Sequence, residues 1–352
     1  MKKAAALVSI LLILAGCTDE NNRQQEDQEV TTATVENEES LAAKLNTPWQ
    51  INHLDGNFYL SERTGTITKV ENGESIRQSV ELQRPLSSAA EAGLLGFVLA
   101  PDFNETNEAY AYYTYEEDGQ PFNAIVVLEL QNDQWSETKV LIDGIPSGSF
   151  HHGGRLAFGP DEKLYATTGD ASNPELAQDL NSLAGKILRV NLDGSIPDDN
   201  PFKDSYVYSY GHRNPQGLTW AEDGTMYASE HGPSANDEIN RITAGSNYGW
   251  PEITGNESKD GMESPIFTSG DNQTWAPSGM AYYENQLFVA GLRGEAVLRF
   301  DLETGENDEQ ISNLGRIRDV YIINGQLYFI SNNTDGRGTP GENDDQLYSV
   351  PL

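Results

Sequence analysis

The sequence predicts an all-β fold, a six-bladed β-propeller whose blades are four-stranded antiparallel sheets. A two-strand pattern recurs six times after Trp49, and no long stretch of helical periodicity interrupts it. Six units over residues 47–352 have about 51 residues each, close to the roughly 40–50 residues of a propeller blade. Closing the sheets into a ring also removes the exposed edges that promote aggregation.

Each unit contributes an aromatic-rich strand and then a second strand in which apolar and polar residues alternate. Turn pairs such as Asp55-Gly56 and Asn324-Gly325 precede several of the first strands. The predicted first strands begin at Phe58, Tyr110, Leu164, Met226, Leu287 and Leu327, and the second strands cover 66–70, 125–130, 186–190, 238–242, 296–300 and 346–350. The second and last units have irregular spacing, and a pair of β-sandwiches is the alternative to a propeller.

The composition excludes several classes of protein. Asp and Glu number 55 against 22 Lys and Arg, a formal net charge of −33, which excludes nucleic-acid binding through a basic surface. The single cysteine excludes an internal disulfide framework and a Cys-rich zinc or iron–sulfur site. With 16 Tyr, the chain is too aromatic to be disordered throughout.

The N-terminal residues predict export and a lipid anchor. Two lysines precede an apolar run over residues 4–16, which is shorter than the roughly 20 residues of a membrane span. The run ends in Leu14-Ala15-Gly16-Cys17, which resembles the lipobox of bacterial lipoproteins. We therefore expect a lipoprotein signal peptide at 1–16, a lipid on Cys17, a disordered acidic tether over 17–46, and an extracytoplasmic protein anchored to the cell membrane by lipid alone. An ordinary secretory signal, with Cys17 incidental, is the alternative.

The segment HHGGRLAFGPDEKLYATTGD, residues 151–170, carries the first candidate site. Asp170 follows a predicted strand, so a return hairpin is expected to bring its carboxylate near His151. A carboxylate behind an imidazole fixes the tautomer of the ring and strengthens it as a base. The alternative is that His151 and His152 are both surface turn residues.

The segment YGHRNPQGL, residues 210–218, displays a cation and two amides within one short turn. Arg213, Asn214 and Gln216 suit a planar, oxygen-rich anion, which an arginine can bind through two parallel hydrogen bonds. A turn with a structural arginine is the alternative.

The segment EHGPSANDEIN, residues 230–240, offers oxygen ligands for a metal ion. The carbonyls of Gly232 and Pro233, with Asp237 and Glu238 close behind, are hard oxygen donors of the kind that calcium binds. The spacing of the acids excludes an EF-hand, and a turn that the acids merely cap is the alternative.

Three arginines in the last third of the chain complete the candidate site. Arg316 and Arg318 alternate along a predicted strand, so both side chains are expected on the same face, and Arg293 lies in an earlier loop. If the loops converge, this cluster forms a site for an anionic ligand despite the negative net charge, because salt screens distant surface charges.

Seven motifs, in order, resemble one known family. EAGLLGFVLAPDF, HHGGRLAFGPD, TTGD, YGHRNPQGL, EHGPSANDEIN, NYGWP and GRIRDV resemble the soluble glucose and aldose sugar dehydrogenases that depend on pyrroloquinoline quinone (PQQ), also called glucose/sorbosone dehydrogenases. The resemblance covers about residues 48–352 and implies a six-bladed propeller with PQQ and Ca²⁺ as cofactors. It also implies an aldose substrate, oxidised at C1 to a lactone by hydride transfer to C5 of the quinone, and an external electron acceptor.

The resemblance also assigns roles to residues. His151 is the general base and Asp170 orients it, while the implied cofactor-binding residues are Glu91, Arg213, Asn214, Gln216, Thr274, Arg293, Arg316 and Arg318. The carbonyls of Gly232 and Pro233 bind the calcium that polarises the quinone, and Glu238 and the Tyr248 carbonyl bind a second, structural calcium.

Two positions depart from the glucose enzymes of this family. Arg293 replaces a lysine, which retains the positive charge but changes its geometry. Glu91 replaces a glutamine, and a carboxylate near an anionic cofactor weakens binding unless it is protonated or directed at the substrate.

Two other functions compete with the dehydrogenase. A calcium-dependent sugar-lactone hydrolase needs a metal bound mainly by side-chain carboxylates and amides, and it leaves the arginines without a role. A non-catalytic sugar-binding propeller predicts that His151 and the arginines do not face one cavity. The sequence does not indicate an oligomeric state.

Overall fold

The computed structural model describes residues 38–352, which form β-sheets with two short helices. Four sheets have four strands each and a fifth sheet has eight. The eight-stranded sheet consists of two antiparallel groups of four, joined by the parallel pairing of β5 (Glu74–Glu81) with β9 (Gln134–Pro146). The all-β prediction is confirmed.

The strands fall into groups along the chain. The groups are β2 (Pro48–Leu54), β3 (Asn57–Glu62), β4 (Thr66–Glu71) and β5; β6 (Leu94–Leu99), β7 (Glu108–Glu117), β8 (Gln120–Gln131) and β9; β10 (Leu156–Phe158), β11 (Leu164–Thr168), β12 (Lys186–Val190) and β13 (Val207–Tyr210); β14 (Pro215–Trp220), β15 (Met226–Glu230), β16 (Glu238–Ile242) and β17 (Phe267–Thr268); β18 (Pro277–Tyr283), β19 (Gln286–Gly291), β20 (Ala296–Asp301) and β21 (Asn307–Ser312); and β22 (Ile317–Ile323), β23 (Gln326–Ser331) and β24 (Leu347–Pro351) with β1 (Glu39–Ala42). The helices are α1 (Phe103–Thr106) and the 3₁₀ helix η1 (Pro174–Ala177).

All twelve strands predicted from the sequence are present. They form six antiparallel pairs, β3–β4, β7–β8, β11–β12, β15–β16, β19–β20 and β23–β24, which are the middle strands of the groups. The sequence pattern therefore identified the two middle strands of every group.

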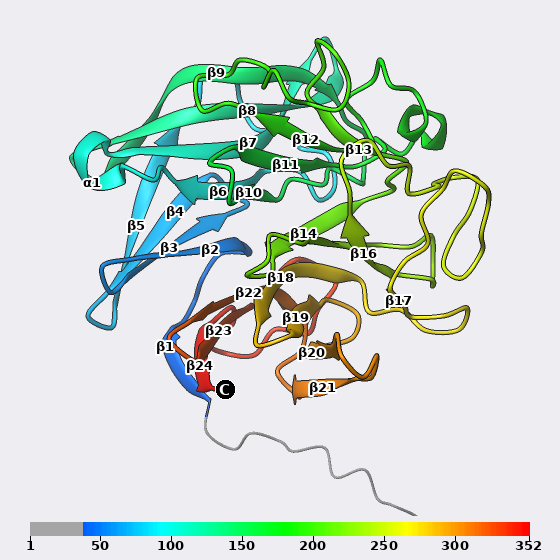
Figure 1. Ribbon diagram of the computed structural model, residues 1–352. Helices are drawn as coiled ribbons and strands as arrows, with labels where there is room; N and C mark the ends of the chain where they lie inside the picture. The colour runs from blue at the N-terminus through cyan, green and yellow to red at the C-terminus, as the bar shows by residue number, and fades with distance from the viewer. Residues whose placement is uncertain (1–37) are drawn as a thin grey trace, which may run out of the picture. The chain divides into compact units, whose positions relative to one another are not determined.

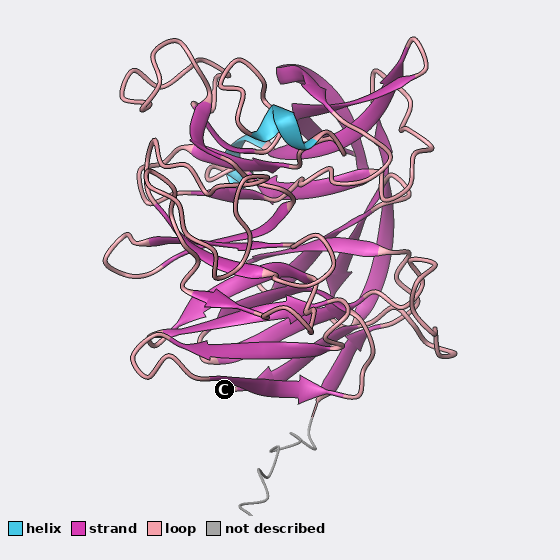
Figure 2. Cartoon of the chain, turned by 90° about the vertical axis from the view of Figure 1, so that its right-hand side faces the viewer, coloured by secondary structure: helices cyan, strands magenta, loops and turns pink. Residues whose placement is uncertain are grey.

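The first strand of each group lies at the centre of the fold (Figure 1). The contacts run from β2 to β6, β10, β14, β18 and β22 and return to β2, so these six strands close a ring. Figure 2 shows the strands and the long loops that connect them from a direction at right angles to the first view. Apolar side chains fill the space between neighbouring groups; one cluster joins Trp49, Leu95, Tyr112, Leu164 and Val207 from the first three groups. The burial of this apolar surface stabilises the ring.

The N-terminal strand β1 completes the last sheet and corrects one predicted boundary. β1 pairs with β24 near the C-terminus, and the backbone N–H of Leu45 donates to the carbonyl of Asp345 at 2.9 Å. Ala42 and Leu45 are buried. Residues 39–46 were assigned to the disordered tether, but the buried side chains of Ala42 and Leu45 and the pairing with the edge of β24 dock them. The predicted signal peptide, Cys17 and most of the tether lie outside the described residues.

No helix within residues 38–352 has the length and apolar character needed to cross a bilayer.

Replacement of Leu45 by alanine tests the role of this segment. Leu45 is 3% exposed, so Leu45→Ala is expected to lower the free energy of unfolding by roughly 2–5 kcal/mol, measured by urea denaturation of the full chain. Leu180→Ala, at a leucine that is 39% exposed, is the matched control and should change stability by about 0.5 kcal/mol or less. Equal stability of the two variants would show that the segment does not contribute to the fold.

Candidate functional site

A cavity of about 360 Å³ opens where the central strands begin. Each central strand contributes its first residues or the loop before it. The lining residues are Trp49, Arg63, Glu91, Leu95, His152, Gly153, Gln216, His231, Ala276, Leu292, Arg293, Glu295, Arg316, Arg318 and Arg337. The ring therefore gathers loops that are far apart in the sequence into one site.

The cavity is strongly cationic. Five arginines line it against two glutamates, although the whole chain has only 22 basic residues. Burial lowers the pKa of Arg318 to about 9, and the positive charge of Arg63 contributes to this shift. Arg318 is still protonated at neutral pH, and an anion in the cavity would stabilise its charge.

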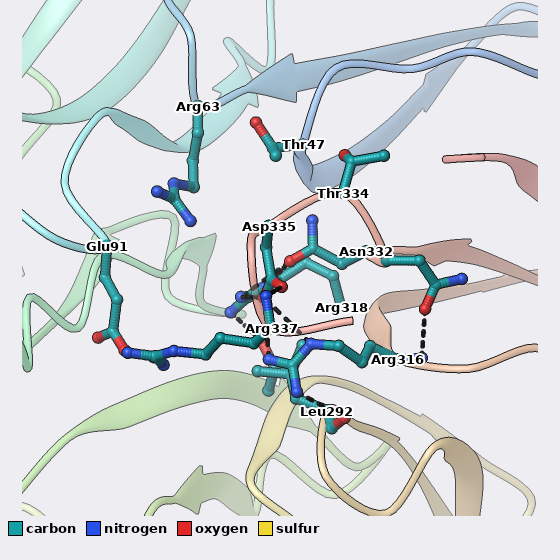
Figure 3. A network of polar contacts seen from close by, with 12 residues as sticks. Thr47, Arg63, Glu91, Leu292, Arg316, Arg318, Asn332, Thr334, Asp335 and Arg337 are labelled. Atoms are coloured by element: carbon teal, nitrogen blue, oxygen red, sulfur yellow. Dashed lines mark hydrogen bonds and ion pairs between the residues drawn. The ribbon is translucent and has the colours of Figure 1, made fainter. Parts of the chain in front are cut away.

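Arg316 and Arg318 are held in place by a polar network (Figure 3). Arg316 Nη2 lies 2.8 Å from Asp335 Oδ2, and Arg318 Nη1 donates to Gln216 Oε1 at 2.9 Å. Arg318 Nη2 also donates to Asn332 Oδ1 at 3.1 Å. Both guanidinium groups line the cavity, as the alternation at 316 and 318 predicts, and Arg293 lies there as well.

Glu91 also lines the cavity, but its carboxylate is paired with Arg337 (Figure 3). Burial by itself would raise the pKa of Glu91, and the attraction of Arg337 outweighs it, so that the pKa is lowered. Arg337 lies in the loop between β23 and β24 and extends over the ring of Phe150, 5.7 Å from its centre. Glu91 is thus charged, and Arg337 is its counter-ion. The sequence analysis did not identify Arg337 as part of the site.

His151 and Asp170 form the predicted pair. His151 Nδ1 lies 2.7 Å from Asp170 Oδ1, and Asp170 Oδ2 accepts a hydrogen bond from Trp250 Nε1 at 2.9 Å. The carboxylate is 1% exposed, whereas the imidazole is 21% exposed. The close approach needs a glycine at 169, because a Cβ there would lie 1.8 Å from the His151 carbonyl oxygen. The pair leaves Nε2 of His151 as the exposed ring nitrogen.

The neighbouring His152 is placed differently. Its Nδ1 lies 2.7 Å from Ser147 Oγ and its Nε2 lies 2.8 Å from the Ala90 carbonyl. Because both ring nitrogens are engaged, His152 supports the wall of the cavity and cannot accept a proton from a ligand.

His231 lines the cavity, and Arg213 is hydrogen-bonded to it. Arg213 Nη1 donates to the His231 carbonyl at 3.3 Å, and its guanidinium lies over the ring of Trp250. Burial lowers the pKa of His231 to about 3. The charge of Glu91 raises this pKa, whereas Arg318, Arg213 and His151 lower it further. His231 is therefore neutral, and the sequence analysis gave it no role.

Three predicted cofactor-binding residues, Arg213, Asn214 and Thr274, are not among the lining residues, and neither are His151 and Asp170. Asn214 Oδ1 accepts a hydrogen bond from the Gly153 backbone at 3.0 Å, and Thr274 Oγ1 donates to Asp237 Oδ2 at 2.8 Å. Both side chains stabilise loops that border the cavity, since Gly153 and Ala276 line it.

The four predicted calcium ligands line one small cavity of about 10 Å³ beside the arginine-lined one. Its lining includes Gly232, Pro233, Glu238 and Tyr248, together with Glu230, which the sequence analysis missed. Burial raises the pKa of Glu238 to about 8, and the charge of Glu230 contributes. The sequence analysis assigned the four residues to two separate ions, whereas the structure brings them together around one cavity.

Within residues 38–352, no group of three or more His, Cys, Asp or Glu side chains is arranged to hold a metal ion.

Comparison with known proteins identifies the family. The Glucose / Sorbosone dehydrogenase family model matches residues 45–339. Quinoprotein glucose dehydrogenase B of Acinetobacter calcoaceticus is 34% identical over 62% of this chain, but the match spans only 53% of that relative. Aldose sugar dehydrogenase YliI of Escherichia coli is 32% identical, with 86% of this chain and 92% of that protein covered.

A solved structure supports the same assignment. The PQQ-bound form of aldose sugar dehydrogenase from Streptomyces coelicolor has a TM-score of 0.83 and 37% identity, with 89% of this chain and 96% of that chain covered. The motifs, the sheets and the site agree with this similarity. The chain belongs to the glucose/sorbosone dehydrogenase family.

Proposed function

We propose that this protein is a PQQ- and calcium-dependent dehydrogenase that oxidises aldose sugars at C1 to lactones. The observation that carries the proposal is the arginine-lined cavity beside the His151–Asp170 pair. Similarity to aldose sugar dehydrogenases, one of them solved in a PQQ-bound form, supports it. The lactone hydrolase is less favoured because it leaves the arginine cluster without a function, and the similarity to aldose sugar dehydrogenases argues against a non-catalytic sugar-binding propeller.

The residues of the cavity fit PQQ, a planar quinone with three carboxylates. Arg293, Arg316 and Arg318 would hold carboxylates, since a guanidinium binds a carboxylate through two parallel hydrogen bonds. Within residues 38–352, His231 Nε2 and Arg213 Nε are buried and have no hydrogen-bond partner. Unpaired buried polar atoms are costly, so a ligand that pairs with them binds favourably. When bound, the quinone accepts the hydride from C1 of the sugar.

His151 acts on the sugar as a general base. With the ring proton on Nδ1 donated to Asp170, Nε2 is free to take the proton of the C1 hydroxyl as the C1–O bond becomes the lactone carbonyl. Asp170 stabilises the imidazolium that results, and its hydrogen bond from Trp250 keeps the carboxylate in position. These two residues thus supply the proton transfer, and the arginines supply cofactor binding.

The small cavity would hold a calcium ion. Glu230, Glu238 and the carbonyls of Gly232 and Pro233 are the hard oxygen donors that calcium prefers. The ion would offset the repulsion between the two buried carboxylates.

Removal of calcium tests this assignment. Excess EGTA is expected to lower the Tm of the calcium-loaded protein by about 5–10 °C, followed by circular dichroism. In Glu238→Gln, the decrease in Tm on addition of EGTA should be smaller by at least about half. Glu263→Gln, at an exposed glutamate outside the cavity, should show the same decrease in Tm as the wild type. A Tm that does not respond to EGTA would argue against a bound calcium.

The family supports a propeller architecture, whereas the proposed location rests on the N-terminal sequence alone. The six groups of strands around the ring correspond to six propeller blades. Residues 1–16 form a lipoprotein signal peptide, Cys17 carries the lipid, and the domain acts outside the cytoplasm, anchored to the cell membrane. An aldose and an external electron acceptor are its partners.

Cofactor reconstitution tests the proposed function. The full chain supplied with PQQ and Ca²⁺ is expected to reduce an artificial dye when glucose or another aldose is added, and a panel of aldoses would define the preferred sugar. Without PQQ, no dye should be reduced. Sugar-lactone hydrolysis in the absence of PQQ would favour the hydrolase instead.

The Glu91–Arg337 pair predicts an increase in cofactor affinity on substitution. Glu91→Gln removes a negative charge from the cavity and releases Arg337, so the Kd for PQQ should fall about 3- to 10-fold. The double variant Glu91→Gln/Arg337→Gln should bind PQQ less tightly than Glu91→Gln alone, because the released guanidinium is absent. Weaker PQQ binding by Glu91→Gln would show that the carboxylate itself holds the cofactor.

A further inference from the structure

Trp250 contacts the His151–Asp170 pair and also lines the small cavity that would hold calcium. Its Nε1 donates to Asp170 Oδ2 at 2.9 Å, and Trp250 is one of the residues around the small cavity. The guanidinium of Arg213 lies over the indole, with Cζ 5.3 Å from the centre of a ring. One residue therefore connects the proposed metal site with the proposed general base.

The segment that carries Trp250, residues 248–255, is attached to the small cavity at both ends. Tyr248, at its start, lines the cavity. At its end, the backbone N–H of Gly255 donates to Glu238 Oε1 at 2.8 Å, and Glu238 lines the same cavity. An ion that binds the Tyr248 carbonyl and the Glu238 carboxylate would therefore hold both ends of the segment, with the tryptophan between them.

A second connection between the small cavity and Asp170 runs through the backbone of Arg213. The Arg213 N–H donates to Glu230 Oε1, and the Arg213 carbonyl accepts a hydrogen bond from the Asp170 N–H at 2.8 Å. Glu230 lines the small cavity, and its Oε2 lies 2.9 Å from Nδ1 of the buried His212. The side chain and the backbone of Asp170 are thus each bonded to a residue that is tied to the small cavity.

The position of the Asp170 carboxylate depends on the indole. Its Oδ1 is bonded to His151 Nδ1 and accepts from the Ser172 backbone N–H, whereas among residues 38–352 only Trp250 donates to Oδ2. The carboxylate is 1% exposed, so water does not readily replace this donor. An indole that moves away leaves a buried oxygen unpaired, which favours another orientation of the carboxylate beside His151.

We propose that Trp250 is a positioning residue through which calcium binding stabilises the His151–Asp170 pair. Occupation of the small cavity by Ca²⁺ restrains residues 248–255 and keeps the indole bonded to Asp170. Asp170 then keeps the ring proton of His151 on Nδ1, which leaves Nε2 free for the sugar. This inference rests on the proposed function, in which calcium binds at the small cavity and His151 is the base.

The tautomer of His151 in protein without PQQ tests the proposal. In a neutral imidazole the ¹⁵N shifts of the two ring nitrogens show which one carries the proton, and His151→Ala identifies the signals of His151 by their loss. In the full chain labelled with ¹⁵N-histidine, the ratio of the Nδ1–H to the Nε2–H tautomer should fall about fivefold or more when EGTA removes calcium. This measurement on the wild type needs no variant that has to fold.

Two tryptophan variants then locate the connection. In Trp250→Phe, the tautomer ratio should be low and should not respond to Ca²⁺. Because coupling between two sites is reciprocal, the Kd of this variant for Ca²⁺, measured by calorimetry, should rise about fivefold or more. Trp220→Phe is the matched control, since Trp220 ends β14 and does not line the small cavity, and it should behave as the wild type in both measurements.

Two results would overturn the proposal: a tautomer ratio that is the same with Ca²⁺ and with EGTA in the wild type, or a response to Ca²⁺ that persists in Trp250→Phe. The second result would show that the charge of the ion acts on His151 directly. If calorimetry detects Ca²⁺ binding while His151 does not respond, only this inference fails and the proposed function stands. If no Ca²⁺ binds, the calcium assignment fails together with it.

Discussion

Replacement of His151 by alanine is expected to lower kcat for aldose oxidation about 100- to 10,000-fold while leaving the Kd for PQQ within about threefold of the wild-type value. His151 has its Nδ1 bound to Asp170 and its other ring nitrogen exposed, so it is positioned to act on the substrate. The cavity arginines that would hold the cofactor are unchanged in this variant. Steady-state dye reduction gives kcat, and a PQQ titration gives the Kd.

Two further variants separate catalysis from structure. His53→Ala removes a histidine that packs against Phe58 and Tyr321, and this variant should retain full activity. Asp170→Asn should reduce kcat and change its pH profile, because the amide no longer fixes the tautomer of His151. Near-full activity of His151→Ala would contradict the role of His151 as the base.

Replacement of Arg318 by alanine is expected to raise the Kd for PQQ about 10- to 100-fold, because hydrogen bonds to charged groups contribute about 1.5–3 kcal/mol each. Arg318 is buried at the cavity and held by Gln216 and Asn332, so its guanidinium is already oriented for an anion. Arg318→Lys retains the positive charge but lacks the two parallel donors of a guanidinium. Its Kd for PQQ should therefore lie between those of the wild type and the alanine variant.

The controls for Arg318 address stability and specificity. Circular dichroism would establish that the variants are folded before the PQQ titration. Arg299→Ala, which removes an exposed arginine paired with Asp308, should bind PQQ as the wild type does. If Arg318→Ala is folded and its Kd is unchanged, the arginine cluster does not hold the cofactor.

The sequence predicted the middle strands of every group but not the strands on either side of them. Middle strands such as β11 and β12 are buried along their whole length and rich in apolar residues, which gives a strong local signal. The central strands are short or irregular: β10 has three residues, and the register of β14 shifts between Pro215 and Gly217. β1 depends on a partner at the other end of the chain, which no local pattern reveals.

In the site as well, contacts between residues that are near in sequence could be predicted, and contacts between distant residues could not. The His151–Asp170 pair could be predicted because one hairpin connects the two residues, and the shared face of Arg316 and Arg318 follows from strand alternation. Arg337 was missed because its partner Glu91 is 246 residues away, and only closure of the ring brings them together. His231 lies in the segment 230–240, but its neutral state depends on surrounding groups from several loops, which no local pattern reveals.

The most direct test of the central claim, that the arginine-lined cavity holds PQQ within reach of His151, is single-turnover reduction of the bound cofactor. Protein loaded with one equivalent of PQQ and Ca²⁺ would be mixed rapidly with glucose, and the absorbance of the oxidised quinone followed. We predict that this absorbance disappears in the wild type, more slowly when C1 of glucose carries deuterium, and persists in His151→Ala. Bound PQQ that stays oxidised in the wild type with every aldose tried, or that is reduced equally fast without His151, would contradict the account.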